Sequence, residues 1–287
     1  MSENNLNLAV INRTDLKDGK SVVIGISTKG SMALHPYILQ QTRDKRGFIY
    51  SFEMKRFLKM AIEYKSVNSK HILCLYKSKD GQDDKENEIN WHLSNSLKKN
   101  GFSLSFHDMS LGLPSKTHSD AGAVISWFRS AEMNNPLAYI EYIERIASRG
   151  AKVIVLGNMG AHRDRKKHQW LDGKEINRVY SILGVDFKGQ WTNKPELIDF
   201  IKEDSNAFKN SVGADIDSIA HYIHIKPVHS SVKPLLELKR NDQKDSLSIP
   251  VFVSAFGAYA ENSYIFGVKS KPYLDIKKLV LDVLLKK

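Results

Sequence analysis

Short apolar runs alternate with longer amphipathic segments through the middle of the chain. HILCLYK (71–77), AGAVISWF (121–128) and KVIVL (152–156) are nearly continuous apolar runs, which is typical of strands buried on both faces. Segments with apolar residues at helical spacing stand before, between or after these runs, at 51–64, 86–101, 135–150 and 172–184. The alternation predicts an α/β fold, with an open, mostly parallel sheet and helices on both faces.

Turn and cap residues set the expected limits of these helices. In the segment 135–150, Asn135 is a candidate N-cap, Pro136 suits the first helical position and Gly150 suits the position after the helix. Gly101 is expected to end the helical segment 86–101, as Gly150 ends the segment 135–150. A shorter helix is expected over PELIDFIKE (195–203).

The two ends of the chain have a different texture. SVVIGIS (21–27) is the best early strand, and we expect residues 1–66 to form an extension that packs on an α/β domain at 67–287. After residue 205, strand-like runs are joined by polar loops, which predicts a strand-richer C-terminal part. An amphipathic helix is expected to close the chain at 274–287.

Composition narrows the class of protein. A hydrophobic content of 41% supports a real core, and the single cysteine, Cys74, excludes a disulfide framework within the chain. The formal charge of +11 favours an acidic partner such as an anionic polymer or nucleic acid. Most lysines are scattered, as on any basic surface, and the dense cluster is 163–167.

The sequence predicts no membrane span, because it has no apolar run of 18 residues. The first residues lack a basic segment followed by a long apolar one, so no signal peptide is visible. The expected compartment is cytoplasmic for the chain as written, and periplasmic if its N-terminus is trimmed.

Candidate chemistry lies where predicted strands end, because ligands of open α/β sheets bind outside the carboxyl ends of the strands. The most distinctive of these exits is the elbow GNMGA after KVIVL. Its centre holds Asn158 and Met159, neither of which is a nucleophile, so no catalytic residue is predicted. Three other exits follow the same rule, at 78–84, 127–135 and 256–264.

Cofactor and metal signals are weak. The chain has neither a GxGxxG fingerprint nor a phosphate-binding loop with Gly-Lys-Ser/Thr. His221, His224 and His229 crowd one segment, but no carboxylate stands at a useful spacing. The sequence therefore predicts no cofactor and no metal.

Aromatic residues near the strand exits suit sugar rings or nucleobases. Trp127, Tyr259 and Tyr264 lie in or next to predicted loops. The alternative is that these aromatic side chains cap the core.

Three stretches resemble a known family: ISWFRSAEMNNPLAYIEYIERIASRGAKVIVLGNMGA, LGVDFKGQWTN and SIPVFVSAFGAYAENSY. They are similar to a class I glutamine-amidotransferase-like, flavodoxin-like Rossmann domain of bacterial Pel-type exopolysaccharide proteins, over about residues 70–285. The resemblance implies this fold without glutaminase chemistry, since the elbow lacks a cysteine. It also implies a binding rim, carried over to Trp127, Asn158, Tyr259 and Asn262.

The function expected from these observations is a non-catalytic accessory role in exopolysaccharide production or export. The chain would bind an acidic or amino-sugar polymer, or a synthase component. Two alternatives stay open: a glycan hydrolase that uses rim carboxylates such as Asp80 and Glu261, and nucleic-acid binding through 163–167. The expected ligand-binding residues are Trp127, Arg129, Asn158, His162, Arg163, Tyr259, Asn262 and Tyr264.

Overall fold

A computed structural model of the chain provides the architecture. It describes residues 6–12, 20–28, 31–33, 69–76, 93–114, 121–128, 132–133, 135–147, 150–157, 163–164, 169–170, 173–187, 198–212, 224–241, 247–261, 264–265 and 272–285.

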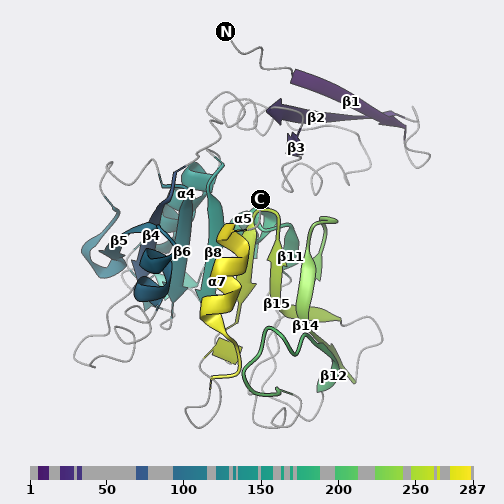
Figure 1. Cartoon of the computed structure of the whole chain (residues 1–287). Coiled ribbons are helices and arrows are strands. Elements are labelled where there is room, and N and C mark those ends of the chain that lie inside the picture. Colours follow the sequence, from purple (N-terminus) through teal and green to yellow (C-terminus); the bar gives the residue numbers. More distant parts are fainter. Residues whose placement is uncertain are drawn as a thin grey trace.

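The centre of the protein is an eight-stranded mixed sheet with the order β12-β14-β15-β16-β8-β6-β4-β5 (Figure 1). Five neighbouring strands run parallel: β4 (His71–Tyr76), β5 (Ser103–Asp108), β6 (Ala123–Phe128), β8 (Lys152–Gly157) and β16 (Gly257–Ala260). Parallel strands are usually covered on both faces, and the apolar runs of β4 and β8 suit this, since their inner positions are buried. The predicted α/β class and mostly parallel sheet are confirmed.

The parallel strands follow an order that reverses once. Counted along the chain, their spatial order is second, first, third, fourth, fifth, because β5 lies outside β4 and the later strands add on the other side. The reversal falls between β4 and β6, which pair directly.

Three antiparallel strands extend the sheet beyond β16. They are β15 (Ser248–Ser254), β14 (Lys233–Arg240) and β12 (Ile198–Glu203). The strand-richer C-terminal part is therefore confirmed. The helix expected over 195–203 is wrong where the structure describes it, because Ile198–Glu203 pairs with β14 at the sheet edge. Pairing along the edge outweighs the helical propensity of the segment.

Side chains of the sheet divide between two hydrophobic clusters, as the alternation of a strand requires. One cluster joins Val153 and Val155 of β8 to residues of α4 (Pro136–Ala147) and α5 (Gly173–Ile182). The other joins Ile154 and Leu156 to residues of α7 (Ile276–Leu285) and to Leu93 and Leu97 of the helical stretch 93–99.

The helices begin and end near the predicted residues. Gly101, Gly150 and Gly184 follow helical segments and have φ angles of 79°, 91° and 86°, the left-handed conformation that glycine adopts without strain. Asn135 precedes α4 with φ of 50°, unlike the extended conformation of a typical N-cap. The helix expected over 51–64 lies outside the described residues.

An ion pair between α4 and α5 fixes the two helices against each other. Arg178 Nε donates to Glu144 Oε1 at 3.0 Å and Nη2 donates to Oε2 at 2.5 Å. Both side chains are mostly buried, with 16% and 12% exposure. The fork of the guanidinium matches the carboxylate, so the pair specifies one geometry.

Several other elements lie outside the central sheet. A three-stranded antiparallel sheet lies near the N-terminus, a two-stranded sheet joins distant segments, and one 3-10 turn follows β5. They are β1 (Leu6–Asn12), β2 (Lys20–Thr28), β3 (Ser31–Ala33), β11 (Val185–Phe187), β13 (Ile225–Pro227) and η1 (Met109–Leu111). The strand predicted at 21–27 is confirmed by β2.

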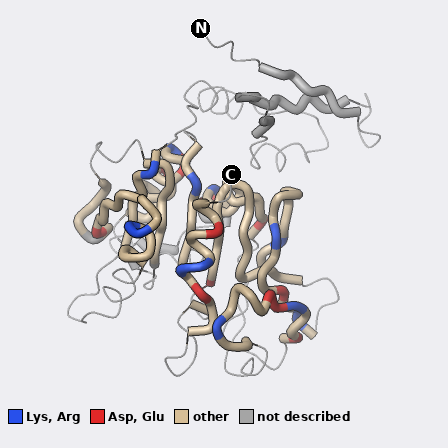
Figure 2. Tube along the Cα trace, in the orientation of Figure 1, with Lys and Arg blue, Asp and Glu red and all other residues tan. Residues whose placement is uncertain are grey.

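Among the described residues, no helix is long and apolar enough to cross a membrane. Basic and acidic positions are interspersed over this part of the chain, as along α7 (Figure 2).

Candidate functional site

The carboxyl ends of the parallel strands form one edge of the sheet. Parallel pairing brings together the ends of β4 and β6, where Tyr76 is opposite Trp127, and of β6 and β8, where Phe128 is opposite Gly157. The order of the strands reverses between β4 and β6, and ligands of such sheets bind outside the carboxyl ends at a reversal of this kind. The carboxyl ends of β4, β6 and β8, where three of the predicted exits begin, therefore meet at this edge. The exit expected at 256–264 is wrong, because Gly257–Ala260 is strand β16 and the antiparallel β15 before it ends at the opposite edge.

Beyond this edge, segments that follow β6 and β8 pair with each other. β7 (Glu132–Met133) pairs in parallel with β9 (Arg163–Asp164), which pairs antiparallel with β10 (Gln169–Trp170). We call this sheet the exit ribbon. Its register sets Glu132, Arg163 and Trp170 side by side on three strands. An acidic, a basic and an aromatic residue thus share one row.

The structure corrects the placement of two expected rim residues. Tyr259 and Tyr264 are 0% exposed and belong to the two core clusters. Tyr259 lies inside β16, and its ring centroid is 5.2 Å from that of Tyr180 and 5.8 Å from that of Phe252. Neither ring reaches the surface, so neither can stack on a polymer there.

Trp127 is also part of the core rather than an exposed rim residue. It is 5% exposed near the end of β6 and belongs to the core cluster that also contains residues of α7. The sequence alternative, in which the aromatic side chains cap the core, therefore describes Trp127, Tyr259 and Tyr264.

A buried polar group follows β16 at the same edge. Glu261 is 2% exposed, so it is not the solvated rim carboxylate expected from sequence. Burial raises the pKa of Tyr259 well above its usual value, and the nearby Tyr180 and Glu261 raise it further. Glu261 is therefore a buried carboxyl group just after the carboxyl end of β16.

Cys74 is a core residue, as expected for the middle of a strand. It is a free thiol in β4 with 4% exposure. Burial raises the pKa of this thiol to about 12, so it stays protonated and unreactive at neutral pH.

The other expected binding residues are placed only in part. Arg163 has a defined backbone position in the exit ribbon. Arg129, Asn158, His162 and Asn262 lie outside the described residues. Asp80, the second carboxylate of the hydrolase alternative, and the centre of the elbow also lie outside them.

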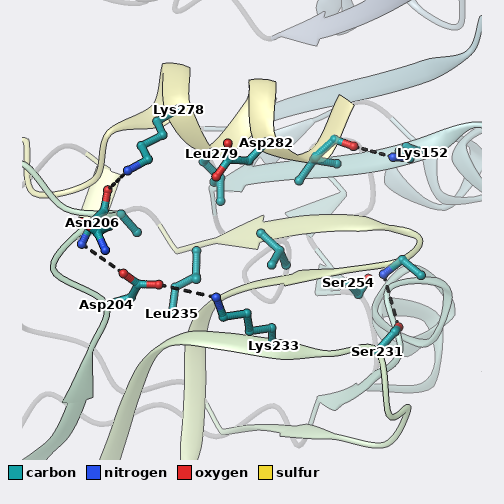
Figure 3. Close-up of a pocket in the computed structure, with 14 residues that line it drawn as sticks. Lys152, Asp204, Asn206, Ser231, Lys233, Leu235, Ser254, Lys278, Leu279 and Asp282 are labelled. Atoms are coloured by element: carbon teal, nitrogen blue, oxygen red, sulfur yellow. Dashed lines mark hydrogen bonds and ion pairs between the residues drawn. The ribbon is translucent and has the colours of Figure 1, made fainter. Parts of the chain in front are cut away.

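A pocket that sequence reasoning missed lies at the opposite edge, between α7 and the strands β14 and β15 (Figure 3). Its volume is about 570 Å³. Its lining comes from five separate segments: the start of β8, the turn 204–207, the start of β14 with the turn before it, the end of β15, and α7. The lining residues are Lys152, Asp204, Asn206, Ala207, Ser231, Lys233, Leu235, Val253, Ser254, Ala255, Lys278, Leu279, Asp282 and Val283.

Hydrogen bonds and an ion pair hold the polar lining (Figure 3). Lys278 Nζ donates to the backbone carbonyl oxygen of Asn206 at 2.6 Å, and the backbone N–H of Asn206 donates to Asp204 Oδ1 at 3.0 Å. Asp204 Oδ2 lies 3.8 Å from Nζ of Lys233. Lys152 Nζ donates to the carbonyl oxygen of Val283 at 2.5 Å, and burial lowers its pKa.

The histidines do not form a metal centre among the residues that the structure describes, where no group of three metal-ligating side chains occurs. His224 is buried, and the Nδ1 atom of His229 lies 2.8 Å from Ser231 Oγ. His229 also contacts Phe256 edge-on, with ring centroids 5.0 Å apart. Burial lowers the pKa of His229, which favours its neutral form.

The chain belongs to the family DUF2194, described as an uncharacterised protein conserved in bacteria, which it matches over residues 57–287. The match includes the whole eight-stranded sheet and begins after the sheet β1–β3. No curated protein is significantly similar to the chain.

Proposed function

We propose that this protein is a non-catalytic accessory protein of bacterial exopolysaccharide production, and that it binds an acidic polymer at the carboxyl edge of its sheet. The family supports a bacterial setting. The remaining support comes from the edge itself, from the charge of the chain and from the resemblance of its segments to Pel-type proteins.

We infer that the fold is flavodoxin-like, with helices on both faces. The spatial order of the parallel strands supports this, since flavodoxin-like sheets have the order 2-1-3-4-5. The separation of α4 and α5 from α7 between two core clusters supports it as well. In this fold the crevice outside the first and third strands is the usual ligand site, which corresponds here to β4 and β6.

The exit ribbon is the observation that carries the proposal. It joins the segments that follow β6 and β8, and β6 is one of the two strands that border the expected crevice. It also sets Arg163 next to Trp170 in register. An arginine and a tryptophan at paired backbone positions suit an acidic sugar chain, because a guanidinium attracts carboxylates and an indole ring packs well on the apolar face of a sugar.

The charge of the chain favours an acidic polymer over an amino-sugar polymer. At +11 the protein attracts polyanions over a distance of about 10 Å at moderate salt. The elbow sequence GNMGA, with Asn158 and Met159 at its centre, supports binding rather than covalent catalysis, since neither residue is a nucleophile.

A panel of polymers tests the proposal. The purified chain would be titrated with alginate, neutral dextran and a single-stranded oligonucleotide, each at 50 and about 200 mM salt. We expect binding to alginate that weakens by less than tenfold between the two salts, and no binding to dextran. Equal binding to alginate and the oligonucleotide, with a steep loss in salt, would contradict the proposal and favour the nucleic-acid alternative. Release of reducing ends from alginate would favour the hydrolase.

A further inference from the structure

We propose that the pocket between α7 and strands β14–β15 is a binding site for a single acidic sugar unit, a polyhydroxylated ligand with one carboxylate. This site lies at the edge of the sheet opposite the one proposed above. It does not depend on polymer binding at that edge.

The pocket has the size and walls of a small-molecule site. Its volume of about 570 Å³ falls in the usual range of about 300–1,000 Å³ for such sites. Leu235, Leu279 and Val253 supply an apolar part of the lining, and the ammonium, hydroxyl and amide groups supply the polar part. A sugar has the same two kinds of surface, since its ring carbons are apolar and its hydroxyls are polar.

The cationic groups are held from different sides of the pocket. Lys278 comes from the first turn of α7 and Lys233 from the start of β14. Each contacts the turn 204–207, Lys278 through the Asn206 carbonyl oxygen at 2.6 Å and Lys233 through Asp204 Oδ2 at 3.8 Å. An ammonium group has three N–H donors, so Lys278 keeps donors for a ligand beyond its bond to Asn206.

The balance of charges selects a monoanion. The lining holds three lysines and two aspartates, which leaves one net positive charge. A sugar carboxylate neutralises that charge. Phosphate is partly doubly charged at neutral pH, with about one and a half negative charges on average. The carboxylates of Asp204 and Asp282 repel this additional charge. The same carboxylates accept hydrogen bonds from sugar hydroxyls.

One serine is already oriented to receive a hydroxyl. The amide of Ser231 donates to His229 Nδ1 at 3.1 Å, so this nitrogen is an acceptor. Ser231 Oγ, at 2.8 Å from the same nitrogen, is then the donor of that bond. Oγ accepts from the backbone amide of Ala255 at 3.2 Å, and a hydroxyl oxygen has a second lone pair that can accept from a ligand hydroxyl.

Titration with defined small molecules tests the site. The probes are D-galacturonate, its neutral counterpart D-galactose, and inorganic phosphate, added to the full chain in calorimetric or NMR titrations. We expect saturable one-to-one binding of galacturonate, with galactose and phosphate each at least tenfold weaker.

Two substitutions in the pocket, Lys278→Ala and Ala255→Trp, locate the binding. Lys277→Ala removes the same charge outside the pocket and is the control for Lys278→Ala. Lys278→Ala should weaken galacturonate binding by fivefold or more, whereas Lys277→Ala should leave it unchanged, because Lys277 is the exposed neighbour on α7 and does not line the pocket. Ala255→Trp should abolish binding by filling the pocket from an exposed turn, with the thermal unfolding midpoint retained.

Several results would overturn the proposal. They are the absence of saturable galacturonate binding, galactose or phosphate binding as tight as galacturonate, and equal effects of Lys278→Ala and Lys277→Ala. Binding that survives in a folded Ala255→Trp variant would place the sugar elsewhere. Loss of alginate binding at the other edge would leave this proposal unaffected.

Discussion

Lys152 and Val283, which stand 131 positions apart, are joined by a hydrogen bond of 2.5 Å from the Lys152 ammonium to the Val283 carbonyl oxygen. The bond connects the first residue of β8 to the last turn of α7. The last four carbonyl groups of a helix have no partner within it, and a cation at this end also offsets the helix dipole. The contact therefore holds α7 against the sheet and closes one wall of the pocket.

Replacing this lysine should loosen α7. We expect Lys152→Met, which keeps the aliphatic chain but not the donor, to lower the free energy of unfolding by about 1–2 kcal/mol. Urea denaturation followed by circular dichroism measures the change. Lys277→Met, on the exposed surface of α7, is the control and should change stability by less than about 0.5 kcal/mol. Equal effects of the two substitutions would rule out a role for the bond.

Cys74 should make stability depend on alkaline pH. Its folded pKa of about 12 lies above the ordinary value of 9.0, so the unfolded chain loses the proton first. The contribution of the thiol is fully present below pH 9.0 and is lost as the pH rises toward 12, at up to ~1.4 kcal/mol per pH unit.

The comparison with Cys74→Ala isolates this contribution, because lysines and tyrosines also titrate in that range. Unfolding free energies at pH 8, 9.5 and 10.5 should fall more steeply for the natural chain than for the variant. Parallel curves would show that Cys74 is not buried in the folded state.

Gly257 should tolerate no side chain. It begins β16 with φ of 151°, and a Cβ atom there would lie 1.7 Å from the carbonyl oxygen of Val153. Since the obstacle is the backbone of the neighbouring strand, Gly257→Ala should lower the free energy of unfolding by more than about 4 kcal/mol.

Gly112 is the control, because it also has a positive φ, of 103°, but has open space around it. Gly112→Ala should cost only about 1–2 kcal/mol. Similar thermal midpoints for the two variants would refute this packing of β16 on β8.

Tyr259 should matter for stability and not for binding. Its ring is fully buried among aromatic neighbours, so Tyr259→Ala should cost about 3–5 kcal/mol, whereas Tyr259→Phe keeps most of the packing. Calorimetric unfolding measures both. Selective loss of polymer binding in a fully stable Tyr259→Ala variant would return this residue to the binding surface.

The parallel core was predictable from sequence because its signals are local. The inner residues of HILCLY and KVIVL are buried in β4 and β8, and no helical period competes with these short apolar runs. Ile198–Glu203 was not predictable in the same way. Its spacing also fits one turn and a half of helix, and only the distant β14 makes it a strand.

The site was predicted less well than the fold. The rule for α/β sheets selected the edge where the ends of β4, β6 and β8 meet. It gave no means to distinguish an aromatic side chain that faces the core from one that faces the solvent. Tyr259 lies in the core because β16 is covered on both faces. All four of its residues are buried, and alternate positions enter the two core clusters. The pocket gave no local signal, since Lys152, Asp204 and Lys278 lie far apart along the chain.

Polymer binding at the carboxyl edge is tested most directly by the affinity for alginate of Arg163→Ala and Trp170→Ala, measured beside that of Lys209→Ala. The first two change the exit ribbon, and the third removes an exposed lysine that lies outside it. We expect each ribbon variant to bind alginate at least fivefold more weakly at about 200 mM salt, and Lys209→Ala to bind like the natural chain. Equal affinities for all three variants would show that the polymer does not bind at the carboxyl edge.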